Sequence, residues 1–218
     1  MIRAAAATTT ALLTLTTAGA HAGVLTQSET YSFQLAPGGT TVTFEQFDEL
    51  DGDRPLVGVE VSFRGTAQVD VTAENDAGVP APDVAAALLS TLSLDVADLA
   101  LDLALERTIA TGGLAASDGV PGSGPDFFDF GTISDSGEAT AFVSAPGDID
   151  TFAGTGTITA DITGAGDWLV VGISEGTVIG QNFMASGDLA ITYTFVPAPA
   201  GATLLAVAAL PLRRRRRA

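Results

Sequence analysis

Carboxylates are the most numerous side chains in this 218-residue chain that could hold a metal or transfer a proton. The sequence contains 26 Asp and Glu, one histidine and no cysteine. Without cysteine the chain can form neither a disulfide nor a thiolate metal or redox site. The histidine, His21, lies in a segment that we expect to be removed. A Ser–His–Asp triad and a His-based zinc site are then both excluded.

Acidic loop clusters suggest calcium, because Ca²⁺ takes oxygen ligands from flexible loops. Three such clusters lie beside expected strands: Asp48 with Asp51 and Asp53, Asp126 with Asp129, and Asp148 with Asp150. None has the spacing of an EF-hand loop. We predict Asp48, Asp51 and Asp53 as the first group to test for calcium. The alternative is turn formation, for which Asp and Gly are the usual residues.

The sequence patterns that would indicate catalysis or ligand binding are less specific than those that suggest calcium. Two carboxylates on opposite sides of a sugar bond can hydrolyse glycosides, but among 26 carboxylates some pair always has a suitable separation. The sequence therefore predicts a protein that is not an enzyme. Trp168, the only tryptophan, is a candidate ligand residue that could stack on a sugar, or it is part of the core. Alternation places Phe128 and Phe130 inward and leaves Phe127 outward or in an edge contact.

The net charge of the chain limits the kinds of partner that it can bind. Between residues 23 and 196, 26 carboxylates face only Arg54, Arg64 and Arg107, which leaves this segment a formal net charge of −23. A nucleic-acid-binding protein needs a basic surface, so nucleic acid is not an expected partner. The acidic surface favours solubility, attracts cations and suits a salty exterior, where ions screen the repulsion.

Alternating apolar residues predict an all-β domain. Seven stretches alternate Val, Ile, Phe, Tyr or Leu with polar residues, as half-buried strands do, and an eighth closes the set. They are residues 30–35, 40–44, 56–63, 67–73, 138–143, 155–162, 168–173 and 189–196. Gly, Asp, Pro and Ser separate them. Eight or more short strands without intervening helices predict an antiparallel β-sandwich of jelly-roll type.

The Ala- and Leu-rich stretch between Pro82 and Thr108 is ambiguous. Ala and Leu favour a helix, and the acidic residues from Asp95 to Glu106 are spaced as on a helical face. The leucines from Leu99 to Leu105, however, alternate as in a strand. We predict a short helical insert at 83–89 and a strand at about 99–105. The segment 117–126 is expected to be a long surface loop between hairpins.

The first 22 residues have the pattern of a secretory signal peptide. Arg3 precedes an uncharged apolar stretch, and Ala20-His21-Ala22 is a small-x-small cleavage site. We therefore expect cleavage between Ala22 and Gly23 after export by the Sec machinery. The alternative, an N-terminal helix of the domain, lacks the polar face of an amphipathic helix.

The C-terminal residues 197–218 combine three features. A proline-containing motif, Val196-Pro197-Ala198-Pro199, precedes a short apolar segment, Gly201 to Leu212. A basic cluster follows, formed by Arg213, Arg214, Arg215, Arg216 and Arg217. The apolar segment is shorter than the ~20 residues of a full span, and the arginines would stay on the cytoplasmic side. The tail is thus expected to act as a weak stop-transfer helix that holds the exported chain at the membrane.

This order of motif, apolar helix and arginine cluster resembles the PEP-CTERM sorting signal and its VPLPA-type relative. The resemblance implies that an exosortase-type membrane protease cuts near the proline motif and releases or transfers the protein. Ala198 stands where the name-giving motif has Glu, which leaves open which sorting enzyme acts. An ordinary tail anchor that is never cut remains the alternative.

The body of the chain resembles the choice-of-anchor E domain over roughly residues 26–196. The similar segments are Gln46-Phe47-Asp48, the strand from Pro55 to Val61, the strand from Val69 to Asn75, the segment from Phe152 to Ile158 and the final strand from Ile191 to Phe195. The Ala/Leu insert at 80–106 and Arg54-Pro55 depart from the family. The resemblance implies a β-rich surface or matrix protein and carries no catalytic residues.

These patterns together predict three parts: a signal peptide (1–22), an acidic β-sandwich (23–196) and a sorting signal (197–218). The protein is expected to be exported and transiently anchored in the inner membrane, then to reside at the cell surface or outside. Its expected role is a non-catalytic component of the envelope or extracellular matrix. The alternative is a carbohydrate-binding module for extracellular polysaccharide, dependent on calcium in one version.

Overall fold

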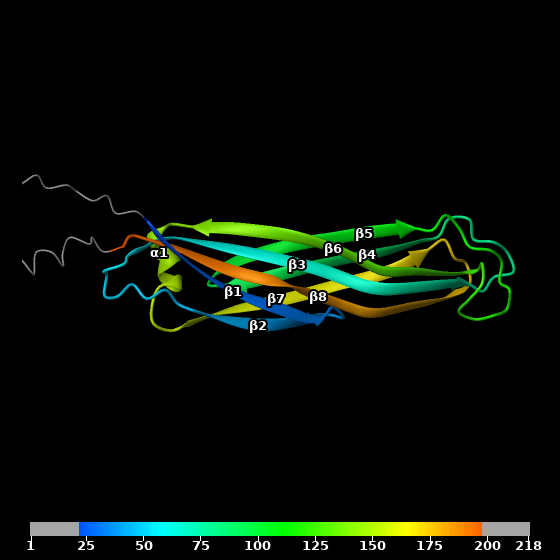
Figure 1. Cartoon of the computed structure of the whole chain (residues 1–218), viewed down its shortest axis with the longest axis horizontal. Helices are drawn as coiled ribbons and strands as arrows, with labels where there is room; N and C mark the ends of the chain where they lie inside the picture. The colour runs from blue at the N-terminus through cyan, green and yellow to red at the C-terminus, as the bar shows by residue number, and fades with distance from the viewer. Residues whose placement is uncertain (1–21, 198–218) are drawn as a thin grey trace, which may run out of the picture.

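The computed structural model describes residues 22–197 as two four-stranded antiparallel sheets packed face to face (Figure 1). The strands are β1 (Gly23–Gln34), β2 (Gly38–Glu45), β3 (Leu56–Asn75), β4 (Ala85–Val96), β5 (Leu99–Ala110), β6 (Phe127–Val143), β7 (Thr157–Val171) and β8 (Gly176–Phe195). Two short helical turns, α1 (Pro146–Ile149) and η1 (Asp150–Phe152), connect β6 to β7.

The strand order confirms the predicted sandwich and its jelly-roll type. Sheet A has the order β1-β8-β3-β6, and sheet B has the order β2-β7-β4-β5. The strands pair first with last, so that β1 pairs with β8, β2 with β7, β3 with β6 and β4 with β5. This is the pattern of a long antiparallel hairpin wrapped into two facing sheets, which is a jelly roll.

The core lies between the sheets and is built by the alternation seen in the sequence. The inward side of β3 is fully buried: Val59, Val61, Phe63, Ala67 and Val69 have no exposed area. Leu88, Leu92 and Leu94 of β4 face them from sheet B with the same burial. Each large apolar side chain removed from water in this way contributes about 1.5–3 kcal/mol.

Several strands of the structure are longer than the segments predicted from the sequence. The stretches 56–63 and 67–73 form the single strand β3, and most of 155–162 and 168–173 lies in β7. The strand predicted at about 99–105 is confirmed as part of β5, and residues 117–126 form a loop between β5 and β6. The turns α1 and η1 were not predicted.

The helix predicted at 83–89 is wrong, because this segment enters strand β4. Ala86 and Leu88 are buried on the inner side, and β4 pairs with β5 on one edge and β7 on the other. Two neighbouring strands satisfy the backbone hydrogen bonds of β4 along its whole length. This tertiary pairing overrides the helix propensity of Ala and Leu, which amounts to tenths of a kcal/mol per residue.

Both ends of the body lie at the same end of the sandwich. Gly23, the first residue of β1, pairs with Phe195, the last residue of β8. The predicted signal peptide up to His21 and the predicted tail helix with its arginine cluster fall outside the described residues. Within residues 22–197, no helix has the length and apolar composition needed to cross a bilayer.

The raised pKa values of the two tyrosines predict how the stability of the domain depends on pH. Burial raises the pKa of Tyr193 to about 12, from 10.0. Burial first, and then the nearby Asp188, raises the pKa of Tyr31. Both hydroxyls donate to backbone carbonyls, Tyr31 to Arg64 at 2.9 Å and Tyr193 to Glu45 at 3.0 Å.

The native state therefore holds both phenols protonated where the unfolded chain would ionise them. Their contribution to stability is complete below pH 10 and is lost as the pH rises from about 10 to 12. Thermal melts across this range should show a falling Tm, with phenolate absorbance appearing only on unfolding. Smooth tyrosine titration near pH 10 in the folded protein would contradict this prediction.

Candidate functional site

The acidic loop between β2 and β3 does not bring its three aspartates together as a metal site. In residues 22–197, no group of three or more His, Asp or Glu side chains is arranged to hold a metal ion. The Asp48 carboxylate instead accepts the N–H of Leu50 at 2.8 Å. Leu50 and Asp51 have φ values of 50° and 55°, as in a tight turn. The geometry of Asp48, Asp51 and Asp53 therefore matches the turn alternative.

This loop also closes one end of the sandwich. The Arg54 side chain donates to the Asp48 carbonyl at 2.5 Å. Its guanidinium lies 5.1 Å from the centre of the Phe47 ring and 5.7 Å from that of Phe195. These distances are within the range of cation–π attraction. The loop thus packs Arg54 onto the aromatic residues that cover the core.

Trp168 packs between the sheets rather than on an outer face. It is half-buried against the core on the inner side of β7. A β-carbon on Gly180 of β8 would overlap the indole ring, so the ring lies directly on the glycine backbone. Trp168 is therefore not an exposed platform for a sugar.

The phenylalanines at the start of β6 follow the predicted alternation. Phe130 is buried, and Phe128 packs against the core, with the two rings 4.9 Å apart in an edge-on contact. Phe127 pairs across the sheet with Glu74 on β3 and is half-buried. None of the three offers a fully exposed aromatic surface.

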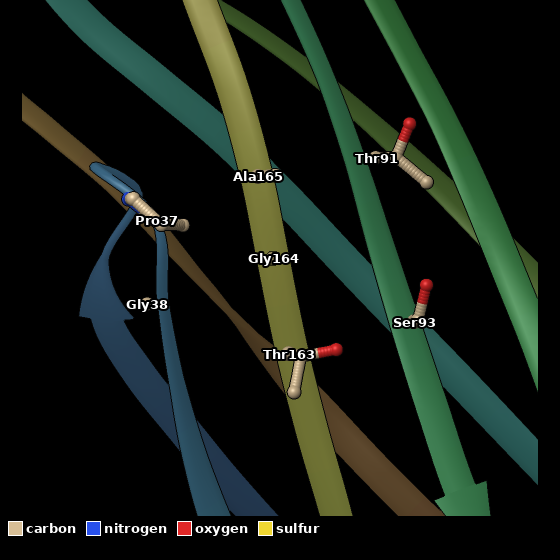
Figure 2. Close-up of a pocket in the computed structure, with 7 residues that line it drawn as sticks. All are labelled: Pro37, Gly38, Thr91, Ser93, Thr163, Gly164 and Ala165. Atoms are coloured by element: carbon tan, nitrogen blue, oxygen red, sulfur yellow. The ribbon is translucent and has the colours of Figure 1, made fainter.

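A shallow hollow lies on the outer face of sheet B (Figure 2). Figure 2 shows Thr91 and Ser93 on β4 at one side of it and Pro37 at the other, with Gly164 and Ala165 of β7 between them. Small residues line the hollow, and its hydroxyl groups come from Thr91, Ser93 and Thr163. The described residues that line it include no ionisable side chain, so the lining supplies hydrogen bonds but no acid or base.

The terminal signals are only partly within the described residues. The Val196 N–H donates to the Pro55 carbonyl at 3.0 Å, so the chain remains fixed to the body up to the sorting motif. Ala22, on the amino-terminal side of the predicted signal-peptide cleavage point, is exposed. Ala20, Ala198 and Pro199, like Arg213 to Arg217, lie outside the described residues.

A polar cluster that the sequence analysis missed lies at the opposite end of the sandwich. Asn75, 1% exposed, donates to the carbonyls of Val79 at 2.8 Å and Ala115 at 2.6 Å. Asp126 is fully buried, and its carbonyl accepts the N–H of Asn75 at 2.9 Å. In the sequence, the features that point to this cluster are Asn75 at the end of a long strand and Asp126 at the end of the loop before β6. Their spacing of 51 residues hides the contact.

Comparison with known proteins adds no family or function. No protein-family model matches the chain, and no curated protein matches it. The structure of infectious bursal disease virus, Gt strain, aligns at 15% identity and a TM-score of 0.11. That alignment covers 84% of this chain and 42% of the viral chain, so this chain spans less than half of the viral one. The strand pairing within the chain defines the fold.

Proposed function

We propose that this chain is an exported, non-catalytic component of the cell surface or extracellular matrix, sorted and processed through its C-terminal signal. The observation that carries the proposal is the pairing of Gly23 with Phe195, which places both ends of the body at one end of the sandwich. A chain cleaved after Ala22 and held by its tail would then stand on the membrane by that end.

The shape of the sandwich suits a body that projects from a membrane. Strand β3 has 20 residues and runs along the long axis of the molecule (Figure 1). At about 3.3 Å per residue it spans roughly 65 Å. The loops at 76–84, 111–126 and 172–175 lie at the end remote from Gly23 and Phe195. In the proposed orientation these loops face the exterior.

The outer face of sheet A supports a structural role. Cross-strand pairs on sheet A join hydroxyl or charged side chains, such as Thr26 with Thr192 at 3.0 Å and Ser62 with Glu138 at 3.0 Å. Arg64 and Glu138 form an exposed salt bridge of 3.1 Å on the same face. A polar, negatively charged surface of this kind stays hydrated and repels copies of itself.

The intact mass of the secreted protein tests this proposal. The mass should correspond to a chain that begins at Gly23 and lacks Arg213 to Arg217, because both terminal signals are removed. Replacing all five of these arginines by alanine should abolish C-terminal processing, since the stop-transfer element loses its cytoplasmic charge.

Arg107→Ala is the matched control, because it removes an arginine from the body and leaves the tail intact. We expect normal processing in this variant. A secreted wild-type protein that retains Arg213 to Arg217, or a cytosolic protein that still begins at Met1, would contradict the proposed sorting.

A further inference from the structure

We propose that the loop 117–126 at the remote end of the sandwich binds one calcium ion through the carboxylates of Asp118 and Asp126. This inference does not depend on the proposed sorting. It starts from a buried charge that the hydrogen bonds of the domain leave incompletely compensated.

Asp126 is the central observation. Its side chain has no exposed area, and its Oδ2 accepts the N–H of Asp118 at 2.8 Å. Its Oδ1 is buried and has no hydrogen-bond partner among the described residues. A buried carboxylate oxygen without a partner destabilises the fold, because it has lost its hydration without replacement. A cation bound at this oxygen would replace the lost hydration and balance the negative charge.

Asp118 supplies a second oxygen at the same place. A β-carbon built on Gly124 would collide with Asp118 Oδ2 and lie 2.8 Å from Asp126 Oδ1. Both oxygens therefore face one small space beside Gly124, whose φ of 95° also favours glycine. Ca²⁺–oxygen distances are about 2.3–2.6 Å, so two oxygens that share an ion are at most about 5 Å apart. Both oxygens lie within 3 Å of the same point, which is compatible with that limit.

The surroundings add negative charge rather than positive charge. Glu74 is 7% exposed, and its Oε2 accepts the N–H of Gly122 in the same loop at 2.9 Å. Within residues 22–197 the salt bridge found is Arg64 with Glu138, so no arginine pairs with Asp118 or Asp126. Buried Asp126 and Glu74, together with the nearby Asp118, carry like charges that repel one another. A cation removes this repulsion.

The ligand chemistry favours calcium over magnesium. The site has two carboxylates, and the remaining ligands would be backbone carbonyls of the loop and water. Ca²⁺ accepts such mixed, irregular oxygen shells, whereas Mg²⁺ demands a near-octahedral shell and gives up water reluctantly.

Thermal unfolding of the exported chain tests the site. After treatment with EGTA, addition of CaCl₂ at a hundredfold excess over Kd should raise Tm by about 5–10 °C. MgCl₂ at the same concentration should raise it much less. Equilibrium dialysis with calcium alone should find one ion per chain.

A pair of matched variants locates the ion. Asp118→Asn should abolish the calcium-induced rise in Tm and the bound ion, yet it should fold. Asp118 is exposed, and the amide oxygen can still accept the N–H of Val120, as Asp118 Oδ1 does at 2.8 Å. Asp48→Asn is the control, because Asp48 accepts the N–H of Leu50 in the same way at the opposite end. This variant should keep the full response.

Three results would overturn the proposal: an unchanged calcium response in Asp118→Asn, an equal rise in Tm with magnesium, or no response of the wild-type protein to calcium.

Discussion

Replacing Phe47 by alanine should lower the free energy of unfolding by about 3–5 kcal/mol. Phe47 is fully buried although it lies in the connection between β2 and β3. Its ring centre is 5.5 Å from that of Tyr193 and 5.0 Å from that of Phe195, and the Arg54 guanidinium lies over it. Truncation would leave a cavity at the end where both termini leave the body. Urea unfolding at equilibrium measures the effect.

Phe142→Ala is the matched control for this prediction. Phe142 carries the same side chain on β6, but it is 63% exposed, and its ring lies where a β-carbon on Gly58 would be 2.7 Å away. We expect its loss to cost less than about 1 kcal/mol, as is usual for surface positions. Similar costs for the two variants would mean that Phe47 does not close the core.

Part of each strand of sheet A was predictable because one face of each strand is solvated, although the first halves of β6 and β8 were not predicted. In β3, buried Val59, Val61 and Phe63 alternate with residues on the solvent side, and this alternation is visible in the sequence. The strand pairing itself was not predictable from any single segment. The β1–β8 pair joins residues that are 150 to 172 positions apart, and no local pattern encodes such a partner.

The segment that became β4 shows where local patterns fail. Ala85 and Ala87 are half-buried on the solvent side, so both faces of the strand carry apolar residues there and the alternation disappears. Without alternation, the helix propensity of Ala and Leu was the main local signal. This preference is weak compared with the stabilisation from two rows of interstrand hydrogen bonds. The partner strands β5 and β7 decided the outcome.

The candidate calcium site was only half visible in the sequence. The acidic loop clusters were recognised, and Asp126 was among them, but it was grouped with Asp129 because the two are close in the chain. In the structure Asp129 accepts the N–H of Gly131, whereas Asp126 turns inward toward Asp118. Burial separates the two carboxylates, and burial of a loop residue depends on how the remote end closes.

A row of glycines across sheet A provides the second large expected effect. Gly65 of β3 pairs with Gly137 on one side and Gly187 on the other. A β-carbon on Gly65 would lie 2.6 Å from Leu92 Cδ1 and 2.8 Å from the Tyr31 hydroxyl. The fully buried Leu92 of the opposite sheet therefore occupies the space that the missing side chain leaves.

Gly65→Ala should lower the free energy of unfolding by about 1–3 kcal/mol through overpacking, and Leu92→Ala by about 2–5 kcal/mol through a cavity. The double variant should lose clearly less than the sum, because the new methyl group enters the space that the leucine vacates. Gly78→Ala, with no atom within 4 Å of the added carbon, is the control and should be close to neutral. Additive losses in urea unfolding of the double variant would show that the two sheets are not matched at this row, and that β3 tolerates Gly65 for some other reason.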